Sequence, residues 1–202
     1  MDFKKIPIGY FIVYKTENDW LQTQIVNYQI KSGFSNQDSQ FVHVEPSIGN
    51  GYSIRASLPF IKPINILDEQ QGRYIKIVAP KFKGKEDLVI DFDSFEGRYK
   101  TALWSASRSN LVYGLLGLLW FPLKRFIRMK NVFSFAGDFC SELCGFGLYR
   151  EYCPHLPAKY DDIESNILPK HYNQLMPADF LNKDFFEIAY EGFIPKKENL
   201  NG

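Results

Sequence analysis

The chain has 202 residues, of which 45% are hydrophobic and 16% aromatic, and its formal net charge is +1. This length can bury one sizeable core, so we expect a single domain over residues 1–202. A net charge so close to zero excludes the strong positive field that is typical of nucleic-acid-binding proteins, and we expect no nucleic-acid partner.

The N-terminus and the cysteine count bear on the cellular compartment. The opening residues MDFKKIPIGYFIVYK include an acidic second residue and a proline, and their apolar run is short and lacks a signal-peptide cleavage pattern. Three cysteines do not describe a disulfide framework and fit a reducing compartment better. We therefore expect a cytoplasmic protein.

The first elements in chain order are a strand and a helix. Residues 8–15 (IGYFIVYK) are β-branched and aromatic, which is typical of a strand. Residues 18–33 predict a short helix, with Asn18 or Asp19 as its N-cap and Gly33 at its end.

A hairpin and a further strand follow. Residues 39–57 contain Asn50-Gly51 between two strand-like runs, and this dipeptide favours a type I′ turn. Residues 72–80 (GRYIKIVAP) predict a third strand region, and 87–93 (DLVIDFD) fits either a strand or the approach to a helix.

The second half of the chain contains an apolar segment and a helical one. Residues 110–127 are mostly apolar, and 140–152 (CSELCGFGLYREY) predict a helix. The remainder alternates polar loops with the segment 176–193. Together these patterns predict an α+β fold.

Cysteine at the start of the helix 140–152 raises the question of a nucleophile. Free backbone N–H groups and the macrodipole at a helix start favour a thiolate, which is the nucleophilic form of cysteine. The alternative is that Cys140 and Cys144 are small apolar residues packed inward.

A histidine on the predicted hairpin could supply the base. Strand alternation places Phe41, His43 and Glu45 on one face, with Val42 and Val44 on the other. A base needs to lie within hydrogen-bond reach of the thiol in space and not in sequence. The alternative for His43 is a structural histidine with its hydrogen bonds satisfied.

The segment HVEPSIGNGYSIRAS, followed much later by FCSEL, resembles the circularly permuted branch of the papain-like, NlpC-type cysteine hydrolases. In that branch the histidine strand precedes the cysteine helix, the reverse of the papain order. IPIGYFIVYK resembles the opening strand, YGLLGLLW the apolar helix before the cysteine, and LMPADFLNKDFFEI the closing segment. The resemblance implies a small antiparallel sheet or barrel packed on helices, with the catalytic cysteine at a helix N-terminus.

The resemblance also implies roles for individual residues. Cys140 would attack a carbonyl to form a thioester, and His43 would protonate the leaving group and activate water or another acceptor. Glu45 would orient His43, since the guanidinium of Arg55 is only a donor and would instead bind an anionic substrate group. The alternative for Glu45 is a solvated carboxylate on an edge strand. The backbone N–H of Cys140 would hold the oxyanion, with Tyr10 as the candidate second donor.

Two departures from the family pattern stand out. The family often has Gly-Asp in its opening strand, whereas Tyr10 follows Gly9 here. In the distantly similar lecithin:retinol acyltransferase group a second polar residue comes from the strand after the turn, and Ser53 and Arg55 occupy the matching region here.

The expected function is that of a cysteine amidase or peptidase acting on a peptide, muropeptide or acyl substrate without a cofactor. The alternatives are a lipid acyltransferase or esterase of the same fold and a non-catalytic binding protein. The apolar run 111–123, too short to span a bilayer, and the basic cluster up to Lys130 fit a buried helix with a solvated face. Segment 111–130 could instead make peripheral contact with an anionic membrane surface.

A structural zinc site is a further alternative from a different class. Cys140, Cys144, Cys153 and His155 form a formal Cys₃His set. Structural zinc sites usually present pairs of ligands two to four residues apart on turns, whereas the first two cysteines are expected one helical turn apart. This spacing argues against zinc, and we expect no metal.

Overall fold

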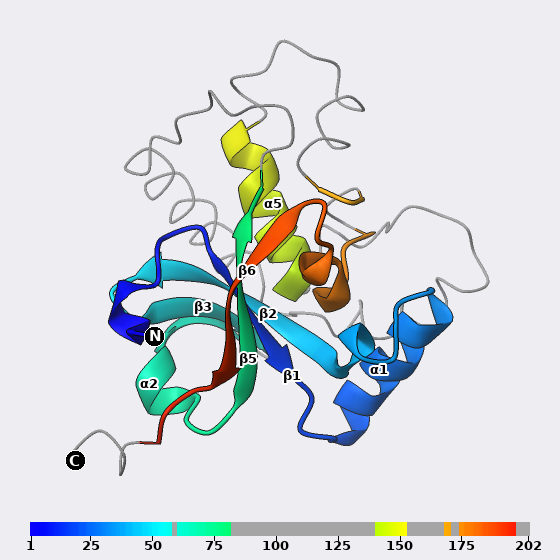
Figure 1. Ribbon diagram of the computed structural model, residues 1–202, viewed down its shortest axis with the longest axis horizontal. Coiled ribbons are helices and arrows are strands. Elements are labelled where there is room, and N and C mark those ends of the chain that lie inside the picture. Colours follow the sequence, from blue (N-terminus) through cyan, green and yellow to red (C-terminus); the bar gives the residue numbers. More distant parts are fainter. Residues whose placement is uncertain (58–59, 82–139, 153–167, 171–173, 197–202) are drawn as a thin grey trace.

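A computed structural model describes residues 1–57, 60–81, 140–152, 168–170 and 174–196. Within them, six antiparallel strands form one sheet in the order β4-β3-β2-β1-β5-β6 (Figure 1). The strands are β1 (Phe11–Lys15), β2 (Phe41–Gly49), β3 (Tyr52–Ser57), β4 (Phe60–Asn65), β5 (Tyr74–Pro80) and β6 (Phe186–Phe193).

Three α-helices and three short 3-10 helices accompany the sheet in the described residues. They are η1 (Phe3–Lys5), α1 (Trp20–Lys31), η2 (Asp38–Gln40), α2 (Ile66–Glu69), α5 (Cys140–Tyr152) and η5 (Pro177–Leu181). Helix α5 contacts β2 and β3 (Figure 1). The architecture is therefore the α+β mixture that the sequence predicts.

The predicted N-terminal helix is confirmed. The side chain of Asp19, and not that of Asn18, caps α1 by accepting a hydrogen bond from the backbone N–H of Gln22. The chain leaves the helix through Gly33, whose φ of +96° lies in the left-handed region that favours glycine.

The structure also contains the hairpin predicted for 39–57, the strand predicted for 72–80 and the helix predicted for 140–152. Asn50 and Gly51 have φ values of 54° and 80°, the two positive angles that a type I′ turn requires. Strand β5 occupies most of the range 72–80, and α5 spans the predicted 140–152.

Some elements were not predicted, and some predictions fall elsewhere. Strand β4 and the short helix α2 were missed; β4 contains a proline and is the last strand at one side of the described sheet, a position where proline is tolerated. The segment 176–193 contains η5 and β6. The segments 87–93 and 110–127, and with them both alternatives for 111–130, a buried helix or a contact with a membrane surface, lie outside the described residues.

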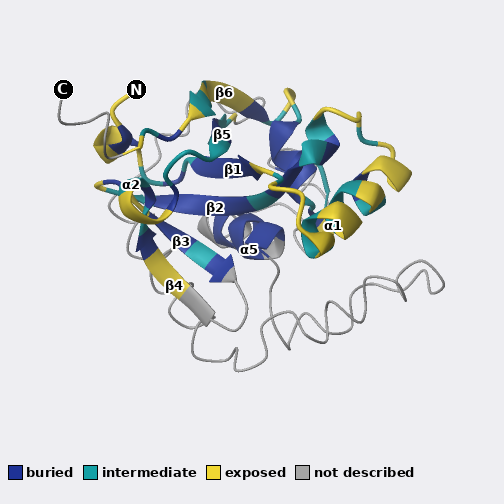
Figure 2. Cartoon of the chain, turned by 90° about the horizontal axis from the view of Figure 1, so that it is seen from below, coloured by how far each residue is buried: buried dark blue, intermediate teal, exposed yellow. Residues whose placement is uncertain are grey.

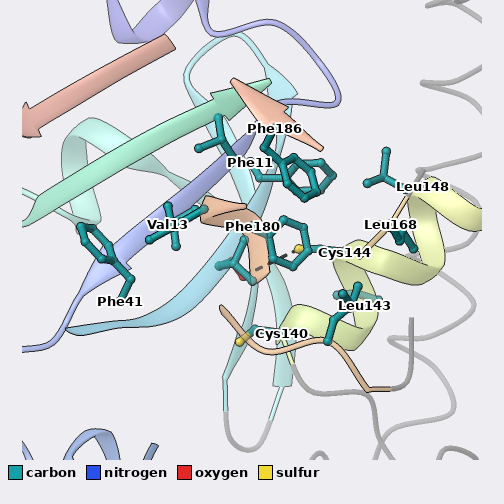
Figure 3. Close-up of a cluster of buried hydrophobic side chains, with 14 of the residues drawn as sticks. Phe11, Val13, Phe41, Cys140, Leu143, Cys144, Leu148, Leu168, Phe180 and Phe186 are labelled. Atoms are coloured by element: carbon teal, nitrogen blue, oxygen red, sulfur yellow. Dashed lines mark hydrogen bonds between the residues drawn. The ribbon is translucent and has the colours of Figure 1, made fainter. Parts of the chain in front are cut away.

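Strand β1 is buried on both of its faces, and its alternation divides the core into two clusters. Phe11 and Val13 belong to the first core cluster, which contains residues of β1, β2, β3, β5, β6, η5 and α5 (Figures 2 and 3). From α5 this cluster takes Cys140, Leu143, Cys144 and Leu148. The apolar side of α5 is thus what covers this face of the sheet.

The second core cluster lies on the other face of β1. It takes Ile12 and Tyr14 from this strand, together with Phe3, Ile6, Ile66, Ile75, Ile77 and Ile194. Segments near both ends of the described chain therefore close the sheet on the side away from α5.

Gln29 connects α1 to the rest of the molecule. Its fully buried side-chain amide donates to the backbone carbonyls of Ser39 and Phe41 and accepts from the backbone N–H of Ala178. All three contacts satisfy backbone groups that would otherwise be buried without partners. One side chain thereby holds α1, the start of β2 and η5 together.

In the described part of the chain, every helix is too short or too polar to cross a bilayer.

Candidate active site

Cys140 is the first residue of α5, where unsatisfied backbone N–H groups favour a negative charge. Cys140 is 9% exposed and is not in a disulfide. The next residue helps to anchor the helix start, since the buried hydroxyl of Ser141 donates to the backbone carbonyl of Leu175 over 2.7 Å. The helix start is therefore held at the edge of the first core cluster (Figure 3).

His43 lies on β2, beside the helix start. A bulge between Tyr14 and Lys15 interrupts the register of β1 with β2 at this point, and bulges re-aim neighbouring side chains. The side chain of His43 is 19% exposed. Although burial opposes its charged form, the charge of Cys140 and a hydrogen bond with its sulfur, together with Glu45, raise the pKa of His43 from 6.5 to about 9.

Glu45 is completely buried and contacts the imidazole. Its Oε1 atom lies 3.0 Å from Nε2 of His43. A carboxylate can only accept hydrogen bonds, so Nε2 carries a hydrogen in this contact. The ring nitrogen that remains for the hydrogen bond with Cys140 is Nδ1.

Three further donors surround this carboxylate. The hydroxyls of Tyr14 and Ser53 donate to Oε2 over 2.8 and 2.6 Å, and Nε of Arg55 donates to Oε1 over 2.6 Å. Burial on its own would raise the pKa of Glu45, but its contacts with His43, Arg55 and Ser53 outweigh it and lower the pKa to about 2. Glu45 is therefore an anion at neutral pH.

Arg55 was predicted to bind substrate, and the structure places it on Glu45. Its side chain is 18% exposed, and its Nη2 atom is buried without a hydrogen-bond partner among the described residues. The charge of Arg55 is thus balanced by a carboxylate of the protein. Cys140, His43, Glu45 and Arg55 form a row in which each side chain contacts the next, with the carboxylate of Glu45 between His43 and Arg55.

Tyr10 was predicted to donate to the oxyanion. It lies immediately before β1, and its partly buried ring packs against the second core cluster, whereas Cys140 belongs to the first. The structure therefore does not bring Tyr10 and Cys140 together in the way that it brings together Cys140, His43 and Glu45.

Cys144 lies one turn after Cys140 and is completely buried, with its thiol 3.8 Å from the backbone carbonyl of Val44 (Figure 3). Cys153 and His155, which complete the formal zinc set, lie outside the described residues. Among the residues that the structure describes, no group of three or more His, Cys, Asp or Glu side chains is placed to hold a metal ion.

Sequence reasoning missed the part that Tyr14 takes in the site and gave none to Ser53. Tyr14 is directly opposite His43 in the pairing of β1 with β2. The available signal was a polar group at the end of an otherwise apolar strand. A polar residue at this position does not show which carboxylate Tyr14 binds. No short turn joins β1 and β2, so their register cannot be predicted from the sequence.

Searches of models of known families, of curated proteins and of solved structures found nothing that matches this chain. The geometry around Cys140 and the family resemblance of the sequence are therefore what bears on the function.

Proposed function

We propose that the protein is a cysteine hydrolase of the amidase or peptidase type with a permuted papain-like fold. The observation that carries this proposal is the pairing of Cys140, at the first residue of a helix, with His43, whose other ring nitrogen is occupied by Glu45. A thiol beside a protonated imidazole places a nucleophile in contact with a general acid.

The proposed reaction has two covalent steps. The Cys140 thiolate attacks the substrate carbonyl carbon, forming a C–S bond, while the backbone N–H of Cys140 stabilises the oxyanion. Collapse breaks the C–N bond, and Nδ1 of His43 gives its proton to the leaving amine. Water then attacks the thioester and passes a proton to His43, which releases the carboxylic acid and regenerates the thiolate.

Glu45 supports both steps without taking part in bond making. As a buried anion it stabilises the imidazolium and keeps the Nε2–H tautomer of His43, leaving Nδ1 toward the sulfur. The order of the elements also supports the permuted family, since the strand of His43 precedes the helix of Cys140, and this helix contacts the hairpin of β2 and β3.

Alkylation by iodoacetamide tests the nucleophile. The intact protein is treated at a series of pH values, and each cysteine is followed by peptide mass mapping. We expect Cys140 to react first and to keep its rate below neutral pH, whereas an ordinary thiol slows about tenfold for each pH unit below its pKa. The buried thiol of Cys144 provides an internal reference.

The His43→Gln variant completes this test, because it removes the base and leaves the exposure of Cys140 in place. It should slow the alkylation of Cys140 and restore the pH dependence of an ordinary thiol. An ordinary pH dependence in the wild-type protein, or an unchanged rate in the variant, would contradict the proposal.

The substrate class is tested by competition. A broad thiol-directed activity probe is allowed to label Cys140 in the presence of peptide amides, muropeptides or acyl lipids. Protection by either amide class supports the amidase or peptidase. Protection by lipids alone indicates the acyltransferase or esterase, and lack of protection by all three favours a non-catalytic binding protein.

A further inference from the structure

Tyr14 occupies an unusual place next to the candidate catalytic pair. It is completely buried on β1 and lies opposite His43 in the strand register. The ring centroids of Tyr14 and His43 are 5.7 Å apart, at an angle of 42°. The guanidinium carbon of Arg73 lies 4.7 Å from the Tyr14 ring centroid. Packing against both groups fixes where the hydroxyl of Tyr14 can be.

That hydroxyl is directed at the carboxylate of Glu45. Tyr14 donates to Oε2 over 2.8 Å, and Ser53 donates to the same oxygen. Burial, and then the charge and hydrogen bond of Glu45, raise the pKa of Tyr14 well above 10, so the phenol keeps its hydrogen. Tyr14 is thus a permanent donor to Oε2.

The two carboxylate oxygens have different partners. Oε2 receives the hydroxyls of Tyr14 and Ser53, while Oε1 receives Arg55 and faces His43. Fixing Oε2 fixes the plane of the carboxylate and therefore the direction of Oε1. A carboxylate held in this way is pre-organised to meet one ring nitrogen.

We propose that Tyr14 is a positioning residue, which holds Glu45 so that Oε1 stays on Nε2 of His43. The proposal deepens the cysteine-hydrolase function and rests on it. Tyr14 touches neither the sulfur nor the reacting carbonyl in the proposed reaction, and it acts only through Glu45. Without its hydroxyl, the carboxylate keeps Ser53 and Arg55 and is free to turn toward them and away from the imidazole.

A test of this role must leave the charged groups around His43 unchanged. In the described residues these are Cys140 from α5 and Glu45 from β2, with Arg55 of β3 and Arg73 before β5 one contact further away. A Tyr14→Phe variant changes none of these charges and keeps the ring that contacts His43 and Arg73. Any change in the titration of His43 then reports the position of Glu45.

The test is the titration of the His43 imidazole, followed by the ¹⁵N shifts of its ring nitrogens in the intact chain. The His43→Gln variant identifies its signals among the three histidines. We expect the midpoint in Tyr14→Phe to fall by about one pH unit, the size of one lost hydrogen bond. The Nε2–H signature should weaken with it. An unchanged midpoint and tautomer in a folded Tyr14→Phe variant would overturn the proposal.

Two variants make this result specific. Tyr74→Phe removes a tyrosine hydroxyl that also donates to a carboxylate, Glu191, but at the surface, and it should leave His43 unchanged. Ser53→Ala removes the other donor to Oε2 and should shift His43 in the same direction as Tyr14→Phe. If Tyr14→Phe does not fold, Ser53→Ala decides, and the absence of a shift overturns the proposal.

Repeating the titration in a Cys140→Ala background separates this proposal from the proposed function. There the sulfur no longer contributes, and the shift caused by Tyr14→Phe must come through Glu45. A shift that persists supports the positioning role even if Cys140 proves to be an ordinary thiol. A shift that disappears overturns the role even if Cys140 proves to be the nucleophile.

Discussion

His43 and Glu45 are separated by one residue on β2, yet Nε2 of the first lies 3.0 Å from Oε1 of the second. Side chains two residues apart lie on the same face of a strand. Here the carboxylate is completely buried, and it accepts from partners on three strands. Replacing Glu45 therefore tests all of these contacts at once.

Replacing Glu45 with glutamine should destabilise the protein by about 3 kcal/mol, because an amide presents donor hydrogens to a site that is built from donors and leaves Arg55 without its anion. Urea unfolding measures this change. Once a substrate is known, the kcat of Glu45→Gln should be clearly lower than that of the wild type. The decrease should be smaller than in His43→Ala, which removes the base itself.

Glu191→Gln is the matched control for that variant. Glu191 also accepts from a tyrosine hydroxyl and lies near a lysine, but it is 39% exposed. Its replacement should cost less than about 1 kcal/mol. Equal losses in the two variants would show that the Glu45 cluster contributes no more than a surface pair.

The stability of the protein should depend on pH through His43. Its pKa is raised from 6.5 to about 9 in the folded protein, so the stabilisation is complete below pH 6.5 and is lost as the pH rises through 9. The difference in the free energy of unfolding between wild type and His43→Gln should therefore shrink over this interval. A difference that stays constant there would contradict the assigned contacts.

Glu45 should give the opposite dependence at acidic pH. Its pKa is lowered from 4.5 to about 2 on folding, so the stabilisation is present above pH 4.5 and is lost as the pH falls toward 2. Urea unfolding at a series of acidic pH values measures it. The Glu45→Gln variant, which lacks the titrating group, should show a smaller loss over this interval than the wild type.

Gln29→Ala should destabilise the protein by about 3 kcal/mol, since it leaves the backbone groups of Ser39, Phe41 and Ala178 buried without their partner. Thermal or urea unfolding measures the loss. Gln24→Ala, at an exposed position of α1, is the comparison, and it should cost less. Comparable losses would mean that the amide of Gln29 does not hold α1 in place.

The turn between β2 and β3 offers a test of backbone conformation. Gly51 has a φ of +80°, and a Cβ there would meet atoms only at ordinary contact distances, so Gly51→Ala should cost about 1 kcal/mol through strain alone. Asn50→Gly, at the other position of positive φ, should be neutral or slightly stabilising. Differential scanning calorimetry distinguishes the two.

Much of the fold near the site could be predicted from local signals. The Asn50-Gly51 turn, the alternation around His43 and the helix beginning at Cys140 each depend on a few neighbouring residues. Such patterns are set by backbone preferences and by burial, and both can be recognised in a single sequence. The proximity of the thiol and the imidazole was predicted only through the family resemblance.

The surroundings of Glu45 could not be predicted, because they depend on a bulge. A regular hairpin with a two-residue turn pairs Ser47 with Ile54, whereas the structure shifts its register at Ile48 and pairs Ser47 with Ser53. A shift of one residue exchanges the faces of a strand. The shift places Ser53 and Arg55 on the same face as Glu45. The turn sequence contains no feature that predicts this shift.

The bond between Gln29 and Ala178 joins positions that are 149 residues apart in the chain. Closing so long a loop has an entropic cost that must be met before the contact exists, and chains dominated by such contacts fold slowly. Phe180 lies against Phe11 in the same way, 5.0 Å between ring centroids. During synthesis, the part of the core between β1 and η5 can therefore close only after residues 177–181 have left the ribosome, although α5 is made earlier and covers its share of the same cluster.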